Sequence, residues 1–338
     1  MKPWLWLPPK LAHDLSPLAI QLYSLLHDAN TPEWGSLSWR GIHFKNRLGL
    51  AGGVDKNGDH LRAWQRLGCG FIEMGTVTPV PQKPNPGTIF DRSIEDGALW
   101  NKMGFPSCGA DEAHYNLKSF KSDSKLPILV NIGKNRQTPN ESAANDYALL
   151  IERFADHADA FVLNISSPNT KGLRDLAGRS ALESFLNPLQ KMKEQQGFHQ
   201  PVLLKLSPDM EIDDLKRVLD VSVEKGIDGF VLTNTTLSRT TVKKFPSEGG
   251  VSGRPLAELS KTALRAAINH LGREKSKKLV ISVGGVMTSD DVFERLSIGA
   301  DLVEVYSTLI FSGLGFFRKV EKAAHGTEQI QFSQIADS

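Results

Sequence analysis

From about residue 45 onward, short apolar and β-branched segments alternate with longer amphipathic segments. The apolar segments have the length and composition of buried strands, and the amphipathic ones repeat apolar residues at the three- and four-residue spacing of helices. Eight apolar segments occur, at 48–52, 71–77, 128–132, 160–165, 202–206, 230–234, 279–283 and 302–307. Helix candidates between them include 146–157, 213–224, 256–271 and 289–298.

Eight successive strand–helix units predict an α/β fold of the (β/α)8 TIM barrel type, with a parallel sheet closed on itself. The alternative is a doubly wound open sheet that binds a dinucleotide. Such a sheet should carry Gly-x-Gly-x-x-Gly after its first strand, and Ala51-Gly52-Gly53-Val54-Asp55 does not fit that pattern. The pattern therefore favours the barrel.

Three segments lie outside the repeat. Residues 78–124 are too long for an ordinary connection, and their apolar side chains favour a lid with strands of its own over disorder. Residues 1–40 are expected to form an N-terminal helical extension, with one short helix after Pro8-Pro9 and a second that begins at Ser16-Pro17. Residues 41–325 then form the barrel domain, and residues 326–338 form a polar tail that is expected to fray.

Composition narrows the function classes. The 40 Lys and Arg residues against 38 Asp and Glu give a formal net charge of +2, which is no bulk reason to expect a nucleic-acid partner. Cys69 and Cys108 are too few for a disulfide framework, and we expect them to be small buried residues of a reduced, cytosol-facing protein. No apolar run reaches the ~20 residues of a membrane span, and Pro8-Pro9-Lys10 interrupts the one candidate stretch.

Polar residues follow nearly every predicted strand, at the end where (β/α)8 enzymes place their active sites. They are Lys56, Thr76, Asn131, Asn164, Ser166, Ser167, Asn169, Lys205, Thr233, Asn234, Thr235, Gly284, Gly285, Tyr306 and Ser307. Amides and hydroxyls with two lysines do not form a metal site or the carboxylate pair of a glycosidase. This set suits a flat heteroaromatic ligand with many donors and acceptors.

The last two strand ends carry a phosphate-site pattern. Val-Gly-Gly-Val at 283–286 precedes a helix near Ser289, and Tyr306-Ser307 follows the eighth strand. Glycines let backbone N–H groups reach a phosphate at this position of a barrel. Phosphorylated substrates and flavin phosphates both use such a site, so the pattern alone leaves the ligand open.

Several motifs together resemble the dihydroorotate dehydrogenase family over residues 3–320. They are Asn-Lys-Met-Gly-Phe at 101–105, Asn-Ile-Ser-Ser-Pro-Asn-Thr at 164–170, Thr-Asn-Thr-Thr at 233–236, Gly-Gly-Val-Ser-Gly-Arg-Pro at 249–255 and Val-Gly-Gly at 283–285. A serine within the 164–170 motif is similar to class 2 of the family, the quinone-linked and membrane-associated form. Class 1 members are expected to carry a cysteine base on a lid loop, and Cys108 is not in such a motif.

The resemblance implies FMN as prosthetic group and dihydroorotate, oxidised to orotate in pyrimidine biosynthesis, as substrate. The residues matching the FMN site are Gly52, Gly53, Thr76, Asn131, Asn164, Lys205, Thr233, Gly253, Gly284, Tyr306 and Ser307. Those matching the dihydroorotate site are Lys56, Asn101, Lys102, Met103, Gly104, Phe105, Asn164, Asn169, Asn234 and Thr235. No metal is implied.

The implied reaction removes a proton from C5 of dihydroorotate and a hydride from C6, which goes to flavin N5. Ser167 is the implied base, and Thr170 and Phe105 are candidates to shape a proton relay through a bound water. Lys205 could place positive charge beside the flavin N1–C2=O edge. A purely structural lysine would need a carboxylate partner, and no matched carboxylate is visible at these strand ends.

Two positions depart from the family pattern. Pro106-Ser107 stands where a pair of asparagines is usual, and Lys171 where a proline is usual. Both bear on lid geometry and loop stiffness more than on chemistry.

The N-terminal segment is expected to face a membrane. Leu11, Leu15, Leu18, Leu22 and Leu25 recur at helical spacing, and Trp4 and Trp6 are residues that favour a bilayer interface. An amphipathic helix usually packs such a stripe on its own domain. The class 2 resemblance favours a membrane instead: His13 and Arg92 match residues of the quinone site, and the implied location is peripheral, on the cytoplasmic face of the inner membrane.

Other functions remain as alternatives. A tRNA-modifying flavin barrel should show a basic surface and a catalytic cysteine. A non-redox isomerase or aldolase would need a carboxylate base or a Schiff-base lysine, and Lys205 leaves the second possibility open. A non-catalytic barrel would not need polar groups at so many strand ends.

Overall fold

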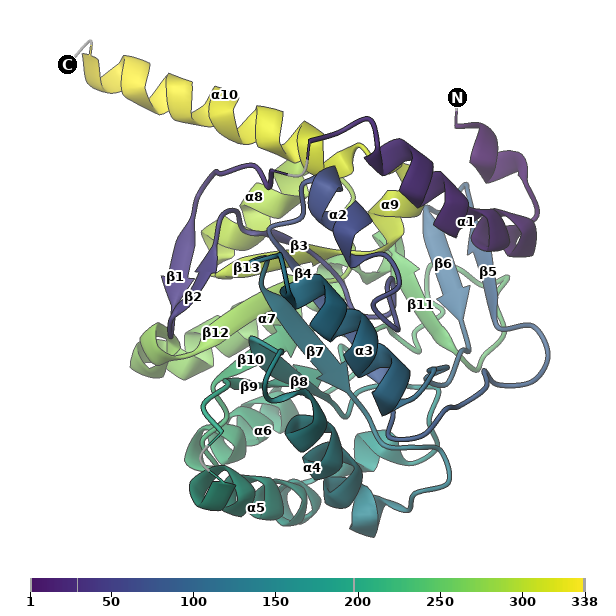
Figure 1. Cartoon of the computed structure of the whole chain (residues 1–338), viewed down its shortest axis with the longest axis vertical. Helices are drawn as coiled ribbons and strands as arrows, with labels where there is room; N and C mark the ends of the chain where they lie inside the picture. The colour runs from purple at the N-terminus through teal and green to yellow at the C-terminus, as the bar shows by residue number, and fades with distance from the viewer. Residues whose placement is uncertain (1, 29, 197, 337–338) are drawn as a thin grey trace.

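The predicted apolar segments are the strands of a closed parallel barrel in the computed structural model, which describes residues 2–28, 30–196 and 198–336 (Figure 1). The barrel strands are β3 (Leu48–Leu50), β4 (Phe71–Val77), β7 (Ile128–Ile132), β8 (Ala160–Asn164), β9 (Val202–Leu206), β10 (Gly229–Leu232), β12 (Leu279–Val283) and β13 (Leu302–Val305). Parallel pairing of β13 with β3 closes the sheet. The predicted barrel is therefore confirmed.

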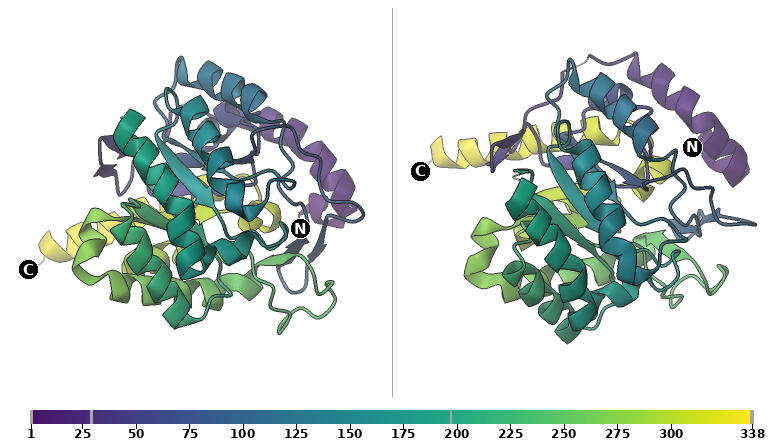
Figure 2. Two further views of the ribbon diagram at one scale, coloured as in Figure 1. Left: turned by 90° about the horizontal axis from the view of Figure 1, so that it is seen from below. Right: turned by 60° about the horizontal axis from the view of Figure 1, so that its bottom comes forward.

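Helices surround this barrel (Figures 1 and 2). They are α2 (Leu61–Leu67), α3 (Ala110–Lys121), α4 (Ala143–Phe154), α5 (Arg179–Gln196), α6 (Ile212–Glu224), α7 (Ala257–Leu271), α8 (Ser289–Ile298) and α10 (Phe316–Ala336), and the short α9 (Ser307–Phe311) follows β13. In α4, residues 147, 150, 151 and 154 are buried, which is the spacing of one helix face. Thr288 and Asp291 cap α8 reciprocally, as a capping box does.

Side chains inside the barrel change from apolar to polar along the strands. Phe71, Leu129, Leu203 and Leu302 belong to one apolar cluster. Two residues further along the same strands stand Glu73, Asn131, Lys205 and Glu304, all buried. Because strand side chains alternate in direction, each of these polar residues points to the same side of its strand as the apolar residue before it. The barrel thus has an apolar floor with polar residues above it.

A hairpin closes the other end of the barrel. Strands β1 (Leu37–Trp39) and β2 (Ile42–Phe44) pair antiparallel, and Phe44 is fully buried against Phe71 with ring centroids 5.6 Å apart. A Cβ on Gly49 would lie 2.4 Å from the Phe71 ring, so only glycine leaves room for this plug. The expected domain boundary at residue 40 falls inside the hairpin.

The long 78–124 segment contributes a small sheet, as predicted. Strands β5 (Phe90–Ser93), β6 (Ala98–Asn101) and β11 (Gly250–Gly253) pair antiparallel in the order β11-β6-β5. The same segment also supplies α3, which packs against α2 and α4 as a member of the outer helix ring. The sequence analysis did not separate that helix from the lid.

The N-terminal extension begins with a 3-10 turn, η1 (Pro3–Trp6), followed by one continuous helix, α1 (Pro9–Ser24). The predicted start of a second helix at Ser16-Pro17 is wrong, because Pro17 lies inside α1. Proline lacks the N–H that would bond to the His13 carbonyl, and the Ser16 hydroxyl donates to that carbonyl instead, at 2.7 Å. The lost backbone bond is thereby replaced.

The C-terminal segment belongs to the last helix, α10. Helix α10 continues to Ala336 and extends away from the barrel (Figure 1). Residues 327–336 contain no glycine or proline, so nothing in their sequence interrupts the helix. The expectation that this polar tail frays stays a prediction.

Candidate active site

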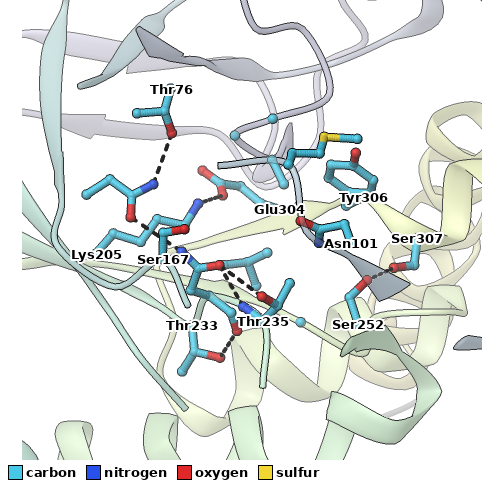
Figure 3. Close-up of a pocket in the computed structure, with 18 of the residues that line it drawn as sticks. Thr76, Asn101, Ser167, Lys205, Thr233, Thr235, Ser252, Glu304, Tyr306 and Ser307 are labelled. Carbon is cyan, nitrogen blue, oxygen red and sulfur yellow. Dashed lines mark hydrogen bonds and ion pairs between the residues drawn. The ribbon is translucent and has the colours of Figure 1, made fainter. Parts of the chain in front are cut away.

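One pocket opens at the carboxyl ends of the barrel strands, beneath the small sheet (Figure 3). Most of the predicted site residues line it. They are Gly52, Gly53, Lys56, Thr76, Asn101, Met103, Gly104, Phe105, Asn164, Ser167, Asn169, Lys205, Thr233, Asn234, Thr235, Gly284, Tyr306 and Ser307. Residues from nearly every strand end therefore meet in one place.

Three other predicted residues do not line the pocket. Asn131 lies deeper and donates to Glu73 at 2.6 Å. Lys102 forms an ion pair with Glu248 at 2.6 Å. Gly253 has φ of +86°, and a Cβ there would lie 2.2 Å from the Gly97 carbonyl oxygen. A glycine is therefore needed at position 253 for the close approach of these two backbone segments in the small sheet.

A chain of amides crosses the pocket floor. The Asn164 amide nitrogen donates to the Thr76 hydroxyl at 3.0 Å and to the side-chain oxygen of Asn131 at 3.3 Å. Its own side-chain oxygen accepts from Ser166 and from Asn234. Because these bonds fix each amide in one orientation, the donors and acceptors that remain are held in place for a ligand.

Lys205 has carboxylate partners that the sequence analysis missed. Its ammonium lies 2.6 Å from Glu73 and 4.0 Å from Glu304, and all three side chains are buried. Figure 3 shows Lys205 and Glu304 pointing toward each other. The expectation that no matched carboxylate stands at the strand ends is therefore wrong. Burial alone would lower the pKa of Lys205, but the neighbouring acidic groups, Glu73 foremost, outweigh it and raise the pKa.

The predicted phosphate end of the pocket is built from close backbone contacts. Gly284 and Gly285 have φ of +111° and +72°, and a Cβ on Gly285 would lie 2.2 Å from the Ala257 Cα. Glycine is required at both positions, since other residues rarely adopt such φ values and have no space here. Nearby, the hydroxyls of Ser252 and Ser307 are 2.9 Å apart and both line the pocket.

The loop after β8 carries Ser167. The Ser167 hydroxyl oxygen accepts from the Asn169 backbone N–H at 3.2 Å, and the Asn169 amide donates to Asn101 at 3.0 Å. The side-chain oxygen of Asn169 is buried without a hydrogen-bond partner. A buried acceptor of this kind is satisfied when a ligand brings an N–H group.

Arg174 joins three loops around the pocket, and the sequence analysis did not identify it. Its guanidinium donates to the Ser166 carbonyl at 2.9 Å and to the Thr235 carbonyl at 3.0 Å, and it pairs with Asp209 at 2.8 Å. The Arg174 side chain therefore connects the loops that follow β8, β9 and β10.

Lys56 lies at the pocket wall, where its ammonium donates to the Gly53 carbonyl at 2.6 Å. Burial lowers the pKa of Lys56 to about 8, although the neighbouring Asp55 carboxylate acts in the opposite direction. The lysine therefore gains and loses its charge close to neutral pH.

The two predicted quinone-site residues lie where the N-terminal extension meets β5. The His13 ring stacks on Phe90 with centroids 4.9 Å apart. Arg92 donates to the backbone carbonyls of residues 4, 5 and 7, so it holds the N-terminal turn in place. The Trp4 indole donates to the Ile310 carbonyl of α9 at 2.7 Å. Since α9 begins at the pocket residue Ser307, the extension packs directly behind the pocket.

The predicted apolar stripe of α1 does not pack on the protein. Helix α1 lies at the periphery of the molecule in all three views (Figures 1 and 2). Exposed side chains are Leu11, Leu15, Leu18, Leu22 and Leu25, with Leu25 at 66% and Trp6 at 73% exposure. No helix among the described residues is long and apolar enough to cross a bilayer.

Glu73 and Glu304 were the main omissions of the sequence analysis. The available signal was a single glutamate inside each of two otherwise apolar strands, since ionisable residues are rarely buried without a partner.

Across residues 2–28, 30–196 and 198–336, no group of three or more His, Cys, Asp or Glu side chains could hold a metal ion.

Comparison with known proteins identifies close relatives of this chain. A family model described as dihydroorotate dehydrogenase matches residues 36–325. The dihydroorotate dehydrogenase (quinone) of Legionella pneumophila (strain Lens) is 41% identical over 280 residues, which cover 81% of this chain and 83% of the relative. That of Psychrobacter sp. (strain PRwf-1) is 38% identical over 327 residues, which cover 93% of both chains.

A solved structure is similar as well. The crystal structure of DHODH from Eimeria tenella in complex with ferulenol superimposes with a TM-score of 0.84 at 33% identity, covering 93% of this chain and 90% of that chain. The ligand-free form from the same organism gives a TM-score of 0.82 at 32% identity.

Proposed function

Because the chain belongs to the dihydroorotate dehydrogenase family and to its quinone-linked class, we propose that it oxidises dihydroorotate to orotate with FMN as prosthetic group and a membrane quinone as electron acceptor. Family membership makes the protein an oxidoreductase that acts on dihydroorotate in pyrimidine biosynthesis. It also removes the tRNA-modifying, non-redox and non-catalytic alternatives. The cofactor, the base and the membrane contact are the parts proposed here.

The pocket suits FMN in its donor set and its backbone geometry. Gly284 and Gly285 bring the backbone close to the phosphate end, where Tyr306 and Ser307 also lie. Thr76, Asn164, Lys205 and Thr233 offer hydroxyl, amide and ammonium groups to the ring. Gly52 and Gly53 line the pocket wall, and Asn131 and Gly253 are proposed to act from behind it. When bound, FMN supplies at N5 the two-electron acceptor that takes the hydride from C6 of dihydroorotate.

Dihydroorotate suits the opposite end of the same pocket. Lys56 offers a positive charge to its carboxylate, and Asn101, Asn169 and Asn234 offer amides that match the alternating N–H and C=O groups of the ring. The unpartnered side-chain oxygen of Asn169 supports this role, because it needs a donor such as a ring N–H. Thr235 and residues 102–105 complete the proposed substrate site.

Ser167 is the proposed base that removes the C5 proton. It is buried at the pocket, and the Asn169 N–H fixes its oxygen. A serine hydroxyl is a weak base, so its proton needs a route out, for which Thr170 and Phe105 remain the candidates. Thr170 is buried, and Phe105 and Ser167 both line the pocket.

The N-terminal extension, residues 1–40, is proposed as the membrane-facing quinone entrance of the 41–325 barrel domain, with 326–338 as an accessory tail. The exposed leucines of α1 and the stacking of His13 beside Arg92 support this. Lys2 and Lys10 against Asp14 and Asp28 leave little net charge on residues 1–28, so adhesion should be mainly hydrophobic. A peripheral position on the cytoplasmic face of the inner membrane follows from the proposed acceptor.

The observation that carries the proposed function is the convergence of lysine, amide, hydroxyl and glycine positions from nearly every strand end in one pocket. The test is the absorption spectrum of the purified protein. A flavin spectrum that dihydroorotate bleaches and a quinone restores is the expected result. A colourless protein that binds no added FMN would contradict the proposal.

A further inference from the structure

The floor of the pocket holds two carboxyl groups and only one cation. Glu73 of β4, Glu304 of β13 and Lys205 of β9 meet there, and each is at most 5% exposed. The uncharged neighbours of Glu304 in the sheet are Val283 of β12 and Gly49 of β3. If both carboxyls were ionised, the cluster would hold a net negative charge in a buried place, which is costly.

Glu73 accepts hydrogen bonds from neighbouring side chains, whereas Glu304 accepts none. One oxygen of Glu73 accepts from both Lys205 and Asn131, each at 2.6 Å. Neither oxygen of Glu304 has a donor, and the second oxygen of Glu73 has none either. The negative charge therefore belongs on Glu73, which has two donors, and Glu304 is the acid without support for an ionised form.

Both carboxyls lie near the same ammonium, with Glu73 at 2.6 Å from Lys205 and Glu304 at 4.0 Å. Two ionised carboxylates held this close can only accept hydrogen bonds, so they would repel each other. A proton on Glu304 turns this repulsion into a hydrogen bond. Consistently, burial raises the pKa of Glu304 well above its usual value, Glu73 raises it further, and Lys205 only partly opposes this shift.

We propose that Glu304 carries a proton which it shares with Glu73, so that the two carboxyls and Lys205 form an electrically neutral cluster beneath the ring bound in the pocket. Glu304 and Lys205 line the pocket, whereas Glu73 lies behind them. In the neutral cluster, the positive charge of Lys205 is balanced by the negative charge of Glu73 alone. The cluster therefore places no net negative charge beneath a ring that gains electrons. This role rests on the proposed function, but the protonation itself does not.

Tight packing supports a fixed geometry for the pair. A Cβ on Gly52 would lie 2.0 Å from the Glu73 carboxylate oxygen and 3.2 Å from the Asn131 amide nitrogen. Glu73 thus fills the space that a side chain at position 52 would need. Because the carboxylate cannot move toward Gly52, it stays against Lys205 and Glu304.

Infrared spectroscopy of the protein as purified tests the shared proton directly. A protonated carboxylic acid has a C=O stretching band that ionised carboxylates lack, and the band shifts in deuterated water. The wild-type protein should show this band at neutral pH, and Glu304→Gln, which keeps size and shape, should lose it. Glu73→Gln should lose it as well, because Glu304 would then ionise against Lys205. Glu294→Gln, which changes a carboxylate paired with Lys261, is the control that should retain the band.

Unfolding at different pH values gives an independent measure. Above about pH 4.3, the ordinary pKa of glutamate, the folded wild type keeps a proton that the unfolded chain loses. Its folding equilibrium constant should therefore fall with rising pH relative to Glu304→Gln, by up to about tenfold per pH unit. A band retained in Glu304→Gln or Glu73→Gln, or parallel pH profiles, would overturn the proposal. A colourless sample would instead contradict the FMN assignment, and both measurements would still decide the protonation.

Discussion

At the scale of single residues, a substitution of the proposed base Ser167 should affect the reaction and leave cofactor binding intact. Its hydroxyl oxygen accepts a hydrogen bond from the Asn169 backbone N–H. The bonds that join Asn164 to Thr76, Asn131, Ser166 and Asn234 do not involve Ser167. Ser167→Ala should leave flavin content unchanged and slow reduction by dihydroorotate about 100-fold or more. Stopped-flow absorbance of the flavin measures this. Reduction at a near-normal rate would remove Ser167 from the role of base.

Lys56 should impose a pH limit on the binding of anionic ligands. Its pKa is lowered to about 8, so the ammonium is charged below that pH and neutral above it. The dissociation constant of orotate should rise above pH 8, by up to about tenfold per pH unit. Absorbance titrations between pH 7 and 9 measure it. Lys56→Arg keeps its charge over this range and should show a flat profile; a wild-type profile equally flat would contradict the assignment.

Some residues of the pocket could be predicted from the sequence, and others could not. Lys205, Asn164 and Ser167 were predicted because strand ends and motifs single them out. Glu73 and Glu304 were not, because each lies within a strand, and the sequence does not reveal that they and Lys205 meet inside the barrel. Their contact depends on how the sheet closes, which the order of residues along one strand does not specify.

At the scale of elements, the loop between β12 and α8 should tolerate no side chain. Gly284 has φ of +111°, and a Cβ there would lie 2.8 Å from Leu256 Cδ2. Gly284→Val should yield colourless, less stable protein, because a left-handed φ alone costs about 1–2 kcal/mol and the contact adds to it. Gly226→Ala is the control, since φ there is +76° but nothing lies within 4 Å. Flavin content and thermal unfolding distinguish the two, and stoichiometric FMN in Gly284→Val would place the phosphate elsewhere.

Arg174 should hold three loops in register around the pocket. Arg174→Met removes its bonds to the carbonyls of Ser166 and Thr235 and its ion pair with Asp209. The expected loss is about 1–3 kcal/mol of unfolding free energy, together with a higher KM for dihydroorotate at unchanged flavin content. Arg179→Met, which removes an exposed pair with Glu183 on α5, should change stability by less than about 0.5 kcal/mol. Equal behaviour of the two variants would count against the positioning role.

Element prediction succeeded where periodicity was strong and failed where side chains replaced backbone bonds. The barrel strands and α8 match the predicted segments closely, since buried strands and a capped amphipathic helix leave clear patterns. The predicted break at Ser16-Pro17 is absent, because Ser16 takes the acceptor that Pro17 leaves free. Helix α3 was not predicted as a separate helix, because it directly follows the glycine- and proline-rich part of the 78–124 segment.

At the scale of the whole molecule, the N-terminal extension and the barrel should be separable in function. The extension contacts the outside of the barrel domain at three places: Trp4 donates to Ile310 of α9, residues of β5 contact it through Arg92 and Phe90, and α1 packs on α2 with Ile20 in the core. The pocket floor, in contrast, comes from the barrel strands. Deletion of residues 1–30 should therefore preserve FMN binding and flavin reduction by dihydroorotate. It should abolish reoxidation by a long-chain quinone and release the protein from liposomes, since the exposed leucines of α1 are lost.

Two point variants give the same separation without a truncation. His13→Ala removes the ring stacked on Phe90, and Arg92→Ala frees the carbonyls of the N-terminal turn, so both should slow quinone reduction while leaving flavin reduction unchanged.

Leu18→Gln with Leu22→Gln should weaken liposome binding alone, because both side chains are more than half exposed and contribute little to folding. Added salt should change this binding only slightly, because the proposed adhesion is mainly apolar. If the truncated protein still reduced long-chain quinone at the wild-type rate, the extension would not be the quinone entrance, and a soluble acceptor would become the better hypothesis.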